Sequence, residues 1–513
     1  MKRIKDVPFF SSFFSFFRKR IRTVTVFFVV SAHLFASGVT LTEIAGDIFN
    51  YRLDEAFRKI QLSANPGGLS ALRDEEKAYA LALYLMHKGL YGEALDEMTK
   101  SGAPETDKWK NYISVMKEIA AGFEAENIAG FNVRFYNRDK VMLPYLRKVL
   151  PEISRAMKRI FGFRPGGVVL EIYPDREKFL KASTLSEDEL ERSGTVAIAK
   201  FGRLMILSPR LLPYGYAWQD TVCHEYIHHI IGNFTGMNIP LYLNEGIAST
   251  FEILWRKSAP ELEPSVKSEL ARAKADGFIA FEKFERGMPS LENQKDVALA
   301  FAEVNYLVYG MYAEGGAKKI KKFLAGCGES GFEKSFIANF SGVDDYMASY
   351  WRNVKNNEWV YSGSSPDFIF WKEDDDFLPL SIKDYMRLGD RLRMTGKYAL
   401  AIGQYAKAEK LEPGNALVMI KIAKTYRSSG NSEKAGEYFA KAALVSPDDF
   451  VCLVSRADFF IEEGKYAEGA SLILKALERN PFYKKGYEEL HKIYLKTGQK
   501  KEAARCAALM EML

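Results

Sequence analysis

The chain has 513 residues, 47% of them apolar and 27% charged, a composition typical of folded globular proteins and unlike that of collagen-like or disordered chains. A chain of this length is too long to fold around a single hydrophobic core, so we expect two or three domains. The four cysteines include no CxxC pair, which argues against a disulfide scaffold. The formal net charge is +6, but residues 1–38 alone sum to +6 (seven basic residues and Asp6, 7 − 1), so the rest of the chain is neutral. It therefore offers no electrostatic basis for binding nucleic acid.

Residues 1–38 have the pattern of a targeting segment. A basic cluster at 18–22 precedes an apolar stretch at 24–35, which is followed by Ala36, Ser37 and Gly38. The apolar stretch is shorter than the roughly 20 residues that a spanning helix needs, which favours a signal peptide cleaved after Gly38 over an N-terminal membrane anchor. Either interpretation predicts an exported protein that is periplasmic, secreted or anchored to the membrane.

Residues 39–128 are expected to be helical. Apolar residues recur at helical spacing around 78–83, and the segment 89–95 has the pattern of a junction between two helices. Two interpretations remain open here: a degenerate helical repeat, or a plain helical lead-in.

The pattern becomes mixed from residue 129 onward. Alternating apolar residues predict strands at 131–136 and 168–173, with a helix at 143–161 between them. A hairpin is expected at 195–208, with its turn at Phe201 and Gly202. The sequence thus predicts a small sheet with helices, in an α+β arrangement, just before the segment described next.

Residues 224–228 carry the sequence His-Glu-x-x-His. On a helix, His224 and His228 project from one face about 6 Å apart, a separation that suits one tetrahedral Zn²⁺. Glu225 stands beside the first ligand, where its carboxylate can act on water at the metal as a general base. Apolar neighbours fill the rest of this helix, so we expect it to be buried and its ionisable groups to need a metal or a partner.

A second helix is expected to begin at Pro240. It carries Glu245 among apolar residues, and a carboxylate there is the expected third ligand, leaving one position open for water and substrate.

Three neighbouring polar groups have more than one interpretation. Glu252 could orient a metal-binding histidine or be a solvated helix charge, and Asp220 is equally ambiguous. His229 faces about 100° away from His228 and is expected to support the site or lie in the core, without binding the metal. Cys223 is expected to be a buried apolar residue.

The tail carries a 34-residue period. Glycines recur at this interval, as do the prolines at 413, 447 and 481; the glycines are Gly396, Gly430, Gly464 and Gly498. This period, with small residues at helix crossings and proline at the turns, resembles the tetratricopeptide repeat (TPR). The resemblance covers residues 381–513 and implies an all-α TPR solenoid that recruits a protein partner or substrate. Residues 357–380 are expected to be a linker.

Residues 224–228 followed by 243–248 (Leu-Asn-Glu-Gly-Ile-Ala) resemble the signature of gluzincin metallopeptidases, specifically of peptidase MA-like domains. The resemblance extends over about residues 129–356, because strands and a helix precede the motif and a helix at 300–309 follows it. It implies an α+β zincin-like domain in which His224, His228 and Glu245 bind Zn²⁺ and Glu225 is the catalytic base.

The sequence departs from this family pattern in two places. No GxMEN stretch precedes His224, so the resemblance does not support an aminopeptidase. Related enzymes place a tyrosine that stabilises the oxyanion near position 301, where this chain has Phe301. Tyr306 is a candidate substitute catalytic residue, and an aromatic side chain on a buried helix face is the other interpretation.

These patterns together predict an exported zinc metallopeptidase, an endopeptidase acting on peptides or proteins, with TPR repeats that hold a partner. The N-terminal segment allows association with a membrane, and no nucleic-acid partner is expected. The alternative that stays open is a non-catalytic TPR scaffold that retains an inactive zincin domain.

Overall fold

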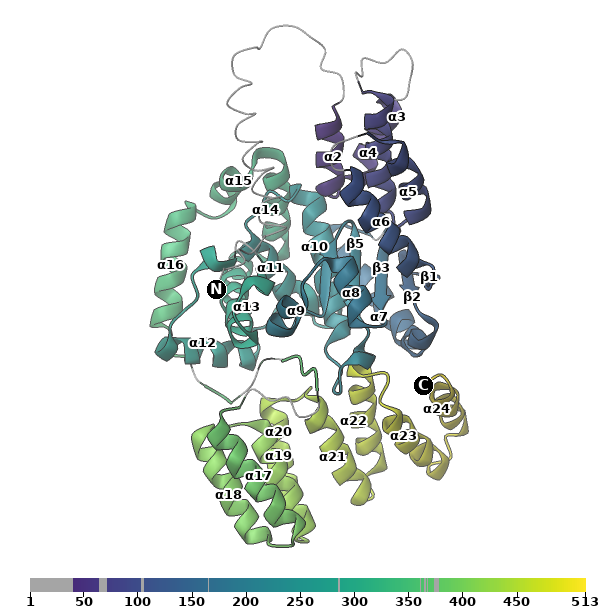
Figure 1. Ribbon diagram of the computed structural model, residues 1–513. Helices are drawn as coiled ribbons and strands as arrows, with labels where there is room; N and C mark the ends of the chain where they lie inside the picture. Colours follow the sequence, from purple (N-terminus) through teal and green to yellow (C-terminus); the bar gives the residue numbers. More distant parts are fainter. Residues whose placement is uncertain are drawn as a thin grey trace, which may run out of the picture.

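The computed structural model describes residues 40–63, 72–102, 106–164, 166–284, 287–359, 361–363, 366, 368–372 and 378–513 (Figure 1). The predicted leader at 1–38 lies outside the described residues, as does part of the predicted linker. The described residues form 23 α-helices and one five-stranded mixed sheet. The predicted combination of a small α+β sheet region and an all-helical region after it is therefore present. No helix among the described residues has both the length and the apolar character needed to cross a membrane.

Five helices precede the sheet and lie at its upper end in Figure 1. They are α2 (Leu41–Phe49), α3 (Leu53–Ser63), α4 (Asp74–His87), α5 (Tyr91–Lys100) and α6 (Thr106–Ala120). The first begins at a capping box, in which Thr40 and Glu43 each bond the other's backbone N–H. The predicted junction at 89–95 is confirmed, since α4 ends at His87 and α5 begins at Tyr91.

The sheet has the strand order β1-β2-β3-β5-β4. Its strands are β1 (Glu124–Ile128), β2 (Phe131–Phe135), β3 (Val168–Tyr173), β4 (Ala197–Lys200) and β5 (Arg203–Leu207). The pairs β2–β3 and β3–β5 are parallel, whereas the outer pairs β1–β2 and β4–β5 are antiparallel hairpins. The central strands β3 and β5 are buried along their whole length, as expected for strands covered on both faces.

Four of these strands confirm the sequence-based prediction, but β1 lies in the range 39–128 that was predicted to be helical. Its residues Glu-Ala-Glu-Asn-Ile are mostly exposed at the sheet edge. This edge strand is held in the sheet by backbone pairing with β2. Because few of its side chains are buried, the sequence carries no alternating apolar pattern that would predict it.

The remaining helices of this region surround the sheet and continue beyond it. They are α7 (Leu143–Phe161), α8 (Arg176–Ser183), α9 (Glu187–Ser193), α10 (Trp218–Thr235), α11 (Leu241–Phe251), α12 (Pro264–Asp276), α13 (Gln294–Ala313), α14 (Gly316–Ser330), α15 (Phe332–Asn339) and α16 (Val343–Asn356). The helix predicted at 143–161 is confirmed as α7. Helix α10 packs against β4 and β5, and α11 packs against both α10 and α13.

A buried ion pair joins the N-terminal helices to the sheet. Arg203 on β5 and Glu171 on β3 are both fully buried, with Nη1 and Oε2 2.9 Å apart. Two phenols from the helices complete this cluster: Tyr112 accepts from Arg203 Nη2 at 2.8 Å, and Tyr91 donates to Glu171 at 3.1 Å. Removing Glu171 would leave the buried Arg203 guanidinium without its ion-pair partner, and the two phenols tie the N-terminal helices to this pair.

Eight helices form the C-terminal region below the sheet in Figure 1. They are α17 (Leu380–Met394), α18 (Tyr398–Leu411), α19 (Ala416–Ser428), α20 (Ser432–Val445), α21 (Phe450–Glu462), α22 (Tyr466–Arg479), α23 (Lys484–Lys496) and α24 (Lys500–Glu511). Helices α18, α20, α22 and α24 begin 34 residues apart (432 − 398, 466 − 432, 500 − 466), as the sequence period predicts. The four periodic glycines follow the first helix of each pair at positive φ, where glycine is unstrained.

The C-terminal helices contact the start of α10. Trp218, its first residue, donates from Nε1 to the carbonyl of Glu478 at 2.8 Å. Asn480 donates to the carbonyls of Leu212 and Pro213 at 3.4 and 3.3 Å. The turn after α22 therefore holds the loop that leads into α10.

Candidate metal centre

Helix α10 carries the His-Glu-x-x-His segment in a buried setting. The apolar residues around the motif (Val222, Ile227, Ile230 and Ile231) are fully buried, as the sequence predicted. In the sequence, Gly232 and Asn233 predict an end to this helix, but the helix continues to Thr235. Asn233 bonds back to the carbonyl of His229 within the helix, and Gly236 supplies the left-handed residue that ends it.

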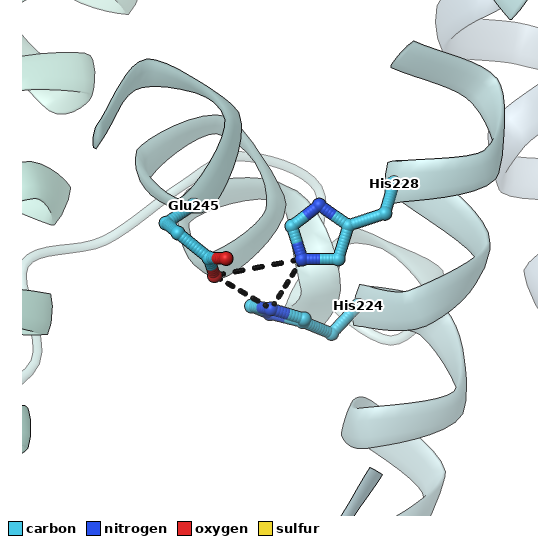
Figure 2. Close-up of side chains that lie close together, drawn as sticks. All are labelled: His224, His228 and Glu245. Carbon is cyan, nitrogen blue, oxygen red and sulfur yellow. Dashed lines mark hydrogen bonds and ion pairs between the residues drawn. The ribbon is translucent and has the colours of Figure 1, made fainter. Parts of the chain in front are cut away.

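Three side chains converge where α10 meets α11. The Nε2 atoms of His224 and His228 lie 3.0 Å apart, and Oε2 of Glu245 lies 3.5 Å from each of them (Figure 2). Among the described residues, these three form the group of His, Cys, Asp and Glu side chains that is compact enough to hold a metal ion. The structure therefore brings together the three residues predicted as ligands.

The outer nitrogens of both histidines are held by hydrogen bonds. His224 Nδ1 lies 2.7 Å from Oε2 of Glu252, and His228 Nδ1 lies 3.0 Å from Oδ1 of Asn244. Both partners are acceptors, so each Nδ1 carries a proton, and each ring in its neutral form presents a lone pair at Nε2. Two such lone pairs and the carboxylate oxygen of Glu245 would repel one another, unless a proton or a metal cation lies between them.

The distances fit one Zn²⁺. Two ligands at about 2.0–2.1 Å from zinc in a tetrahedral arrangement are roughly 3.3 Å apart, within the range of the 3.0 and 3.5 Å observed. Two imidazole nitrogens and one carboxylate oxygen are also the donor set of catalytic zinc sites, which keep a fourth position open.

The electrostatics of the three residues favour a cation between them. Burial lowers the pKa of His224, but its hydrogen bonds with Glu245 and Glu252 outweigh burial and raise the pKa well above its ordinary value. Burial acts to raise the pKa of Glu245, but the charges of His228 and His224 outweigh it and hold that pKa below the ordinary range. The two carboxylates thus favour positive charge at the histidine Nε2 atoms, and a metal cation bound there would supply that charge in place of a proton.

Glu225 lies on the side of α10 that faces the edge strand β4. It is buried, and burial raises its pKa. His228, His224 and an interaction with the backbone of Ala199 on β4 act to lower that pKa. A buried carboxylate of raised pKa next to the two candidate metal-ligand histidines has the proton affinity that a general base needs.

The two aromatic candidates for the oxyanion lie in different places. The Phe301 ring packs edge-on against the His224 ring, with centroids 6.0 Å apart. The Tyr306 ring packs against Trp359 at 4.9 Å and Tyr350 at 5.9 Å. The residue that packs against His224 is thus Phe301, which has no hydroxyl, whereas Tyr306 packs in a cluster with Trp359 and Tyr350.

The structure distinguishes the ambiguous polar neighbours. Glu252 orients His224, whereas Asp220 bonds Trp255 and forms an ion pair with Arg256 at 2.7 Å. His229 is buried against aromatic rings, and Cys223 is a fully buried free thiol, as expected.

Two contributors were missed by the sequence analysis. Asn244 stands directly before Glu245 on a helix, and this adjacency to a predicted ligand is a signal that could have identified it. Ala199 acts through its backbone, so its side chain carries no signal for the contact with Glu225.

No protein-family model matches this chain, and a comparison with curated proteins gives no significant match.

Proposed function

We propose that this chain is a zinc-dependent metallopeptidase of the gluzincin type that hydrolyses peptide bonds outside the cytoplasm. The observation that carries this proposal is the convergence of two histidine Nε2 atoms and the Glu245 carboxylate near the buried Glu225. The α+β sheet region that holds these residues is compatible with a zincin-like domain.

Each residue of the site has a role in this proposal. His224, His228 and Glu245 would hold Zn²⁺, which when bound polarises a carbonyl and lowers the pKa of water. Glu225 takes a proton from that water and delivers it to the leaving amine. Glu252 and Asn244 keep the rings of the two histidines in the orientation and tautomer that binding requires.

The edge strand β4 is the proposed binding edge for the substrate backbone. It pairs with β5 on one side only, and extended peptides bind such edges through backbone hydrogen bonds. Helix α10 packs directly against β4, so a peptide on this edge would pass beside Glu225.

Two features outside the site complete the proposal. The leader pattern at 1–38 supports export, with the protein free or anchored by this segment. The helix pairs at 380–511, with their 34-residue period, support a TPR array that recruits a protein substrate or an assembly partner.

A second candidate is a non-catalytic TPR scaffold with an inactive zincin domain. It is favoured by the contact of Phe301 with His224 and by the packing of Tyr306 against other aromatic rings, because neither then donates to an oxyanion. The intact ligand set and the buried base favour the enzyme, since a scaffold requires neither.

Peptide hydrolysis separates the two candidates. The full-length zinc-loaded protein should cleave members of a mixed peptide library, as followed by mass spectrometry. Chelation of the metal or the substitution Glu225→Gln should abolish cleavage. A zinc-loaded protein that cleaves none of the library peptides would instead support the scaffold.

A further inference from the structure

The free edge of β4, which faces away from β5, is covered at one end and open at the other. In an antiparallel pair, residues alternate between positions that bond the partner strand and positions whose backbone groups point away from it. The bond from Leu207 N to the Val196 carbonyl fixes this alternation. Ala199, paired with Leu204, therefore directs its N–H and carbonyl toward the free edge, and so does Ala197.

The carbonyl of Ala199 on this edge is already bonded. It accepts a hydrogen bond from the hydroxyl of Tyr51 at 3.3 Å, and the backbone of Ala199 interacts with the Glu225 carboxylate, which acts to lower the pKa of that group. Tyr51 comes from the turn between α2 and α3, 148 residues earlier in the sequence. The N-terminal helices thus occupy the β4 edge at the position beside the proposed base.

The hairpin turn beyond Ala199 is covered as well. The Phe201 ring packs edge-on against His87, Trp109 and Tyr112, with centroids 5.9, 5.8 and 5.2 Å away. A Cβ on Gly202 would lie 3.1 Å from the carbonyl of His87. The edge of β4 is therefore closed from Ala199 through the turn by α2–α6.

The Tyr51 ring is built into this position. Its backbone has φ 63°, a left-handed conformation that costs energy in a residue other than glycine. The ring meets His229 edge-on at 5.3 Å, and it lies where Gly232 has no side chain, since a Cβ there would be 2.8 Å from the ring. Arg52 is fixed next to it by an ion pair with Asp47 at 2.6 Å.

We propose that Tyr51 and the turn between α2 and α3 close one end of the substrate edge, so that the protein cleaves peptides close to one chain end. A substrate strand can pair with β4 from Ala197 toward residue 195, but it meets Tyr51 where it would pass Ala199. This inference rests on the proposed peptidase function, and it narrows the expected endopeptidase to one that does not cleave in the middle of a long extended strand.

Binding of phosphinic peptides to the zinc-loaded full-length protein tests this inference without using activity. Three probes share one phosphinate group, which imitates the tetrahedral intermediate, and carry a peptide arm on its N-terminal side, on its C-terminal side or on both sides. Calorimetry should show that the two-armed probe binds at least about tenfold more weakly than the better one-armed probe.

Two variants locate the cause. Tyr51→Gly removes the ring and suits the positive φ, so it should remove most of the difference between the probes. Tyr51→Phe keeps the ring and loses only the hydroxyl, so it should retain the difference. If Tyr51→Gly does not fold, the comparison of the three probes on the unchanged protein still decides the question.

The possible failures are distinguishable. A two-armed probe that binds the unchanged protein as tightly as the better one-armed probe would overturn the closed end and leave the peptidase proposal standing. Failure of all three probes to bind a protein that contains zinc would overturn the peptidase proposal, and the inference with it.

Discussion

The protons on two imidazole rings decide what the centre can bind. Glu252 and Asn244 accept from the Nδ1 atoms of His224 and His228, so both Nε2 atoms are left to face Glu245. The orientation of the two imidazole rings therefore depends on the acceptors Glu252 and Asn244 as well as on the histidines themselves.

Weakening one such acceptor should weaken metal binding. In Glu252→Gln the charged acceptor behind His224 is lost, so the affinity for Zn²⁺ should fall about 10- to 100-fold in a competition titration with a chelator. Asp220→Asn is the matched control, because Asp220 lies one turn before His224 but bonds Trp255 and Arg256. Equal losses in the two variants would contradict the orienting role of Glu252.

Glu303 on α13 gives a pH-dependent prediction of stability. It is fully buried, and burial raises its pKa from 4.5 to about 8. The folded state therefore keeps a proton that the unfolded state releases between these values. The stability that this proton contributes is fully present below pH 4.5 and is lost as the pH rises toward 8.

Glu303→Gln should remove this pH dependence, since the amide stays neutral. At pH 8 the variant should be more stable than the unchanged protein by on the order of 2–4 kcal/mol, with the advantage vanishing near pH 4.5. Urea unfolding at several pH values measures it. A difference that stays constant with pH would show that Glu303 does not titrate in this way.

At the scale of elements, the crossing of α11 and α13 sets the position of Glu245. Gly246 lies at this crossing, and a Cβ there would be 2.8 Å from both the carbonyl of Val304 and the Cγ2 of Val308. The helices can approach this closely only because residue 246 has no side chain.

Gly246→Ala should therefore move α11 and its ligand. We expect a loss of about 1–3 kcal/mol in the free energy of unfolding, together with weaker zinc binding. Gly403→Ala in α18 is the control, because its Cβ would enter open space and should stabilise the protein by about 0.5–1 kcal/mol. Unchanged zinc affinity in a destabilised Gly246→Ala variant would show that the crossing does not set the geometry of the centre.

The local spacing of apolar residues and of repeated residues was sufficient to predict the elements with strong periodicity. The strands at 131–135 and 168–173, the helix at 143–161 and the 34-residue helix pairs follow directly from spacing. Residue spacing did not predict β1, because its polar edge residues are mostly exposed. Nor did the sequence predict the end of α10, where Gly236 and not Gly232 takes the left-handed conformation. The convergence of His224, His228 and Glu245 was predictable, because four-residue spacing places the two histidines on one helix face and Glu245 stands among apolar residues of the next helix.

At the scale of the whole molecule, the centre is supported from both sides by helices distant in sequence. Tyr51 reaches Ala199 from the N-terminal helices, and Glu478 and Asn480 hold the start of α10 from the C-terminal helices. No sequence pattern predicts these contacts, because each joins residues more than 100 positions apart through one or two hydrogen bonds.

Asn480→Ala should loosen the C-terminal attachment. The carbonyls of Leu212 and Pro213 lose their donor, so we expect about 1–2 kcal/mol less stability and faster amide hydrogen exchange at 212–218. Ser446→Ala changes the same repeat position one period earlier (480 − 34) and should leave exchange at 212–218 unaltered. Equal exchange in the Asn480→Ala variant and the unchanged protein would contradict the attachment.

The zinc content of the purified full-length protein tests the central claim most directly. Elemental analysis should find one zinc per chain in the unchanged protein and in Glu225→Gln, which keeps all three ligand atoms, but none in Glu245→Ala. A protein that contains no zinc after zinc-replete purification would contradict the metallopeptidase account and leave a helical-repeat scaffold as the better description.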